Sequence, residues 1–382
     1  MKDYGMRRRR SGPAARLLGA VVVLGIAGLL TWAFWPPADG GGRKGQATTA
    51  PARDAEAVPV IADAGDGKDA NDQKVPATRP DAGVTDPGKT GTTRTSQPTS
   101  PPIPVPDLDT PDPAISQTDA ENAYKRGLEL LENQKYLEAR GELSRALRFG
   151  RLAEKDNEEI RKTLELMGEV TIFGRTAFPD DPYTFSYQFA VGDVLSGKRG
   201  LIRKKNLRVP APLILKVNRL KDDSRLEAGR SYKLIRGPFH AVVYKSKRVM
   251  DLYLQTTFVQ RYPIGIGAPE TPTPEGYFHV LLGGKTLHTS YYPPAGSRLA
   301  GPIHPGEKGY PLDEEGHNIK LVGIPEKGTH YGVGNGFAIH GTSDPASIGQ
   351  AKSLGCIRLS PKHIRQVYAM LYEHWSTVTI RP

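Results

Sequence analysis

The sequence has very little cysteine and no aromatic residue in a long early segment. A single cysteine, Cys356, occurs among 382 residues, so no disulfide can form within the chain and the fold must rely on ordinary packing. Between Pro36 and Ala123 there is no Phe, Tyr or Trp. A segment of that composition buries too little apolar surface to offset its conformational entropy, which excludes a compact core there.

Charge, basic stretches and histidine spacing limit which partners and cofactors the protein can be expected to bind. The formal net charge of +11 indicates a polyanionic partner such as nucleic acid, a membrane surface or a cell wall, or else serves only solubility. No basic stretch is interleaved with stacking aromatics, so we do not expect nucleic acid. The histidines other than His340 show no metal-ligand spacing, and we expect neither a metal nor another cofactor.

The N-terminal region has the pattern of a membrane anchor. Residues 1–16 form a basic tail, and residues 17–35 carry no charge over a length that spans a bilayer as a helix. The pattern predicts a single-pass helix in the inner membrane, with a cytoplasmic tail and all later residues in the periplasm or cell-wall space. A cleaved signal peptide is the alternative, although Trp35-Pro36-Pro37 is a poor cleavage site.

Residues 36–117 are predicted to be a disordered linker, because they are rich in Pro, Gly, Thr and Asp and lack aromatic side chains. Such a linker would tether the folded domains to the membrane.

The first predicted folded unit, residues 118–170, is helical. Its apolar residues recur at intervals of three and four, and a third helix is expected near Glu154 to Met167. Four small or apolar positions resemble one tetratricopeptide-type hairpin: Gly127, Ala139, Leu143 and Ala146. We expect the hairpin to be a spacer or to dock a protein partner.

Residues 183–237 resemble a LysM module, a small βααβ fold that binds glycans containing N-acetylglucosamine. The resemblance rests on the turn Val191-Gly192-Asp193, on Asn218, and on Leu226 followed by Gly229. The middle of the segment is longer than usual and rich in Lys and Arg. An unrelated small α+β domain is the alternative.

The last predicted domain, residues 238–382, is mostly β. Alternating apolar and polar residues predict its strands, and Ser360-Pro361 predicts an N-cap and first turn for a helix from Lys362 to Tyr372. The expected strands are Ala241–Tyr244, Met250–Gln255, Phe258–Ile266, Tyr277–Leu282 and Thr377–Arg381. The Gly-rich stretch from Gly301 to Gly336 is expected to be a lid over the site or a floppy surface loop.

Three segments of this domain carry a specific resemblance. They are YPIGIG with TPTPEG between Tyr262 and Gly276, AIHGT from Ala338 to Thr342, and SLGCIRL from Ser353 to Leu359. In this order they resemble the L,D-transpeptidases with a YkuD-type catalytic domain. The resemblance implies a β-sandwich-like fold and a cysteine that acts on peptidoglycan stem tetrapeptides. Leu354 departs from the family pattern, where many members have histidine.

The residue types support this chemistry independently. Acyl transfer through a covalent intermediate needs a nucleophile, a base and an oxyanion site. A nearby imidazole should lower the pKa of Cys356 or take its proton. His340 precedes flexible Gly341 and should emerge at a strand end, while the Gly355 and Cys356 amides could hold an oxyanion.

The resemblance also implies roles for individual residues. Cys356 would be the nucleophile, His340 the general base and acid, and Gly341 the carbonyl that orients the imidazole. Arg358 would shape the site or meet a substrate carboxylate, and Ser353 and Thr342 would line the pocket.

The expected reaction begins with a thioester between Cys356 and a donor tetrapeptide, with release of D-alanine. An amine on a second stem would then form a 3→3 crosslink. Water as acceptor would make the protein an L,D-carboxypeptidase, and an amine on a protein would attach that protein to the wall. Two alternatives stay open: a non-catalytic anchor that binds peptidoglycan, and a general cysteine protease.

Overall fold

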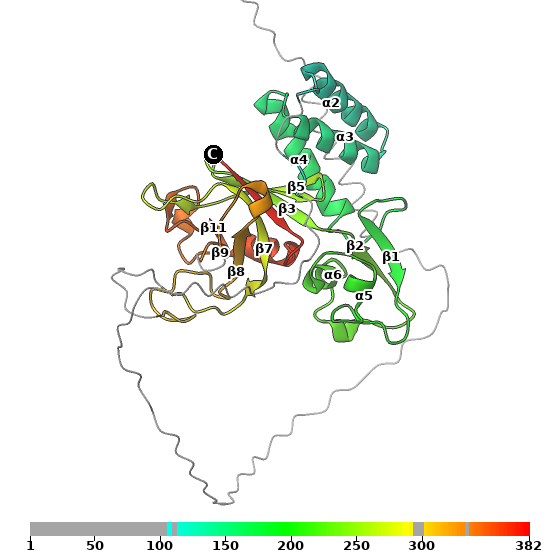
Figure 1. Ribbon diagram of the computed structural model, residues 1–382. Helices are drawn as coiled ribbons and strands as arrows, with labels where there is room; N and C mark the ends of the chain where they lie inside the picture. The colour runs from blue at the N-terminus through cyan, green and yellow to red at the C-terminus, as the bar shows by residue number, and fades with distance from the viewer. Residues whose placement is uncertain (1–104, 109–112, 293–301, 333–335) are drawn as a thin grey trace, which may run out of the picture. The chain divides into compact units, whose positions relative to one another are not determined.

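The computed structural model describes residues 105–108, 113–292, 302–332 and 336–382 (Figure 1). The predicted basic tail, the transmembrane segment 17–35 and most of the linker lie outside these ranges. Within them, no helix combines the length and the apolar character that crossing a bilayer requires.

Three helices form the first unit, namely α2 (Gln117–Glu132), α3 (Tyr136–Phe149) and α4 (Glu154–Thr171). A side chain at Gly127 would come within 2.6 Å of the Leu143 side chain, so α2 and α3 approach too closely for any larger residue there. Leu108, which falls in the range predicted as disordered, is only 3% exposed and packs with these helices.

The second unit has the predicted β, α, α, β order. Its elements are β1 (Thr184–Gln188), α5 (Leu201–Lys204), α6 (Ala211–Val217), a 3₁₀ turn (Asp223–Arg225) and β2 (Ser231–Ile235). Asn218 ends α6 and bonds both backbone groups of Lys233: Nδ2 donates to the carbonyl and Oδ1 accepts from the amide, each at 2.8 Å. The asparagine therefore fixes α6 against β2, which pairs antiparallel with β1.

The catalytic-domain candidate contains one eight-stranded sheet in the order β11-β9-β8-β7-β12-β3-β4-β5. Its strands are β3 (Phe239–Tyr244), β4 (Val249–Leu254), β5 (Thr257–Pro263), β7 (Gly276–Thr286), β8 (Asn318–Gly323), β9 (Ala338–Gly341), β11 (Ile357–Leu359) and β12 (Thr377–Arg381). Gly265, just past β5, forms an antiparallel bridge to Arg358 in β11. The two ends of the sheet therefore meet and give a barrel-like sheet, within the mostly-β domain that the sequence predicted.

Shorter elements complete this domain. They are β6 (Ile266–Gly267), β10 (Ala351–Ser353), α7 (Pro361–Met370) and 3₁₀ turns at Pro325–Lys327 and Pro345–Ser347. Ser360 caps α7 by accepting from the His363 amide, as predicted. The strand expected to run from Phe258 to Ile266 is divided: β5 ends at Pro263, and Ile266 pairs with β10 instead.

The three units share their cores. Ala241 and Val243 face a cluster that also includes the βααβ unit and α7. Val242, between them, faces the helical unit together with Tyr253 and Phe258. Successive side chains of a strand point to opposite faces, so β3 lies between two cores and joins units that the sequence suggested were separate modules.

Candidate active site

Cys356 is the residue immediately before β11, and its thiol lies beside the backbone of the segment that leads into β9. Sγ is 3.6 Å from the Gly336 carbonyl oxygen. Burial raises the pKa of the thiol, while a hydrogen bond from the Ala338 amide and the charge of Arg358 act in the opposite direction. Since burial is the largest of these effects, the resting group is a thiol at neutral pH.

His340 lies on β9 and is only 8% exposed. Its Nδ1 is 2.6 Å from the Gly341 carbonyl oxygen, so in the neutral ring Nδ1 carries the proton and Nε2 is the atom that can accept one. Burial lowers the pKa of His340 to about 4. The imidazole is therefore neutral at pH 7 and available as a base.

Arg358 acts electrostatically on both His340 and Cys356. It is the register partner of His340 between the parallel strands β11 and β9, so the two side chains lie on one face of the sheet. Its charge contributes to lowering the pKa of both His340 and Cys356. Of the two ways in which the imidazole was expected to activate the thiol, this arrangement fits proton removal, because the pKa of Cys356 is raised rather than lowered.

The turn before Cys356 is held by the first of the three sequence segments. Gly355 has φ +110°, a conformation that strongly favours glycine. Thr273 donates its hydroxyl proton to the Gly355 carbonyl at 2.8 Å and accepts from the Gly267 amide at 2.8 Å. Because the amide of a trans peptide unit points away from its carbonyl, these bonds fix the direction of the Cys356 amide.

Ser353 also holds this turn. It is 2% exposed, and its Oγ donates to the Cys356 carbonyl at 2.6 Å and accepts from the Gly355 amide at 3.2 Å. The Gly355 amide is thus already engaged. Of the two amides expected to hold an oxyanion, the one at Cys356 is the better candidate.

Thr342 and Arg358 line a cavity of about 450 Å³ next to the site, together with residues 307 and 309–311. Within the described ranges, Nε of Arg358 is buried and has no hydrogen-bond partner. Five other buried side-chain atoms of the described residues also lack a hydrogen-bond partner, among them Nε of Arg148 and of Arg161. What distinguishes Arg358 is its place on the wall of this cavity, where a carboxylate from outside could pair with it.

Several residues near Cys356 were missed by sequence analysis. Burial raises the pKa of Tyr291 and of Tyr331, and the charge of Cys356 in its ionised form adds to both shifts. Asp313 contributes to the pKa of His340. These residues lie in or beside the Gly-rich stretch, where no periodicity marks an individual side chain.

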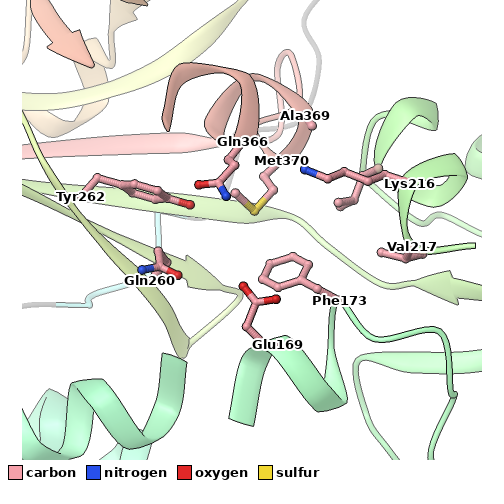
Figure 2. Close-up of a pocket in the computed structure, with 10 residues that line it drawn as sticks. Glu169, Phe173, Lys216, Val217, Gln260, Tyr262, Gln366, Ala369 and Met370 are labelled. Carbon is pink, nitrogen blue, oxygen red and sulfur yellow. The ribbon is translucent and has the colours of Figure 1, made fainter. Parts of the chain in front are cut away.

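A separate cavity of about 250 Å³ lies where α4, α6, β5 and α7 meet (Figure 2). In Figure 2, Glu169 and Lys216 extend into it from different elements. None of the predicted site residues lines this cavity. In the parts of the chain that the structure describes, no group of three or more His, Cys, Asp or Glu side chains is placed to hold a metal.

Comparison with known proteins agrees with the motif. Residues 238–380 match the family model YkuD, described as the L,D-transpeptidase catalytic domain. YkuD of Bacillus subtilis (strain 168), provisionally named as an L,D-transpeptidase, is 28% identical over 144 residues, which cover 37% of this chain and 66% of that protein. The namesake in Bacillus licheniformis is 27% identical over 146 residues, covering 38% and 67%. The chain therefore spans about two thirds of the length of these relatives.

Solved structures give partial matches. An L,D-transpeptidase from Mycobacterium smegmatis aligns with a TM-score of 0.29 and 17% identity, covering 40% of this chain and 64% of that one. An L,D-transpeptidase from Mycobacterium tuberculosis H37Rv aligns with a TM-score of 0.29 and 19% identity, covering 41% and 64%.

Proposed function

Because residues 238–380 form an L,D-transpeptidase catalytic domain, we propose that the protein transfers acyl groups of peptidoglycan stem peptides through a thioester on Cys356. The observation that carries the proposal is the pairing of His340 with Arg358 on β9 and β11, beside the residue that precedes β11. In this proposal Cys356 is the nucleophile, His340 the proton acceptor and Arg358 the cation. Cysteine acyl transfer needs the first two, and a cation can bind a substrate carboxylate.

In the first step, Nε2 of His340 takes the Cys356 proton, and the sulfur attacks the carbonyl carbon of the L-centre of a donor tetrapeptide. Both groups are neutral at rest, so the proton moves as the C–S bond forms. The Cys356 amide holds the oxyanion. The C–N bond then breaks, the imidazolium returns the proton to the departing nitrogen, and D-alanine leaves.

In the second step, an amine on another stem peptide attacks the thioester. Its proton passes to His340, the C–S bond breaks, and the sulfur recovers a proton from the imidazolium. With a stem side-chain amine the product is a 3→3 crosslink, which is the outcome we propose. Water in place of the amine would make a carboxypeptidase, and an amine on a protein would attach that protein to the wall.

The remaining units would bring this site to the wall. We propose that the βααβ unit contacts glycan strands, that residues 17–35 anchor the chain in the membrane, and that the helical unit is a spacer or docks a protein partner. Because the βααβ unit shares a core with the sheet, a glycan bound there and a stem peptide at Cys356 would be held in a fixed relation.

Mass spectrometry of the intact protein and of the muropeptides tests the central proposal. After incubation with tetrapeptide muropeptides, the wild type should carry an acyl adduct on residues 353–359 and release D-alanine. Cys356→Ala should do neither and should keep the melting temperature of the wild type. Equal D-alanine release by the variant would refute the proposal. Wall binding by the wild type without adduct or release would favour the non-catalytic anchor.

A further inference from the structure

A buried carboxylate lies behind the peptide that orients His340. Asp313, on the segment between β7 and β8, is 2% exposed. Its Oδ1 accepts from the His317 amide at 3.0 Å, and its Oδ2 is 2.7 Å from Nδ1 of the same histidine. The carboxylate is therefore fixed within a tight turn from Asp313 to His317 and cannot swing away without breaking these bonds.

That turn is attached to the strand that carries His340. The Gly341 amide donates to the His317 carbonyl at 3.2 Å. A Cβ at position 341 would overlap Oδ1 of Asp313, so the carboxylate occupies the space that a side chain would need. The carbonyl of the same glycine accepts from Nδ1 of His340 at 2.6 Å. The position of Asp313 therefore fixes Gly341, and the Gly341 carbonyl in turn fixes the imidazole of His340.

The charges around His340 act in opposite directions. Burial lowers its pKa to about 4 and Arg358 adds to this, whereas the Gly341 carbonyl and the Asp313 carboxylate raise it. On the far side of Asp313, Nε2 of His317 lies 3.3 Å from Glu315, which in turn lies 3.4 Å from Arg365. During the proposed reaction the imidazole becomes cationic, and a fixed negative charge nearby stabilises that state.

We propose that Asp313 is a positioning residue for the proposed reaction: it holds Gly341 so that the carbonyl orients His340, and it places a negative charge behind the imidazole when the ring takes the thiol proton. The inference rests on the proposed function and extends it to a residue outside the three motif segments. It also explains why position 341 must be glycine.

The test compares two carboxylates of the same turn. Asp313→Asn keeps the shape and removes the charge against Gly341, and Glu315→Gln removes the charge on the other side of His317. With tetrapeptide muropeptides, Asp313→Asn should lower kcat for D-alanine release about 10- to 100-fold with little change in KM, as loss of a charge-assisted contact does. Glu315→Gln should stay within about twofold of the wild type.

A readout that needs no substrate is the titration of the His340 imidazole by NMR, with its signal identified by its loss in His340→Gln. Asp313→Asn should move the pKa of His340 below the wild-type value, and Glu315→Gln should leave it in place. An unmoved titration, or a wild-type kcat in Asp313→Asn, would overturn the inference while leaving the thioester proposal intact. A wild type that releases no D-alanine would overturn the function, and the titration would still decide the place of Asp313.

Discussion

Two polar regions of this protein differ in how completely their polar side chains are hydrogen-bonded. One is the junction of Arg140, Thr171, Asp181 and Lys233, where the helical unit meets the βααβ unit. There Arg140 lies 2.7 Å from Asp181 and donates to the Thr171 hydroxyl at 2.6 Å. Nζ of Lys233 donates to three carbonyls at 2.8 Å each, those of residues 171, 174 and 176.

The other region is the end of β9 and β11. Among the described residues, Nε of Arg358 is buried without an acceptor. Sγ of Cys356 receives a hydrogen bond from the Ala338 amide and lies 3.6 Å from the Gly336 carbonyl oxygen. Buried polar groups are nearly always satisfied in folded proteins. The polar groups named at the junction have partners, whereas Nε of Arg358 has none and its side chain lines a cavity beside the candidate site. We expect a substrate carboxylate to supply the missing acceptor there.

The comparison predicts that breaking the junction affects stability and leaves the chemistry unchanged. In Arg140→Met the Asp181 carboxylate stays buried without its cation, which should lower the free energy of unfolding by about 3–5 kcal/mol. Urea denaturation measures this loss, and D-alanine release per folded molecule should match the wild type. Adding Asp181→Asn should recover part of the stability. A double variant as unstable as the single one would show that the ion pair is not the cause.

A glycine substitution at the site should affect both properties. Gly355→Ala places a side chain at φ +110°, which costs about 1–3 kcal/mol, and rotates the peptide that aims the Cys356 amide. Gly328→Ala is the matched control, because this glycine has φ +78° and a Cβ at that position would meet only open space. Both variants should lose stability, and only Gly355→Ala should lose D-alanine release, by about tenfold or more. An equal loss of activity in both would assign the effect to stability alone.

The sequence predicted what local pattern and motif determine. Strand β4 and helix α7 follow from alternation and from the Ser360 cap, while the roles of Cys356 and His340 stay predictions from their motifs. Strand β8 was missed inside the Gly-rich stretch, because it is defined by its partners β7 and β9. Contacts between distant segments could not be predicted either. Thr273 and Gly355 are separated by 82 positions, and the residues around each of them do not predict their hydrogen bond.

The smallest expected effect concerns the pH dependence of the junction. Burial lowers the pKa of Lys233 from 10.5 in the unfolded chain to about 7. Between these values the unfolded chain binds a proton that the folded chain has released, so the free energy of unfolding should rise with pH. The gain from pH 7 to pH 8 should be about 1 kcal/mol.

Lys233→Met isolates that contribution, since it keeps a long side chain and removes the titrating group. Its unfolding free energy should lack the rise, and the difference between wild type and variant across pH 7 to 8, measured by urea denaturation, is the test. Parallel curves for the two proteins would mean that the three carbonyls keep the ammonium charged in the fold, because hydrogen bonds to the charged form offset the cost of burial. The junction would then be satisfied at every pH in this range, and its contrast with the unpartnered Nε of Arg358 would be sharper.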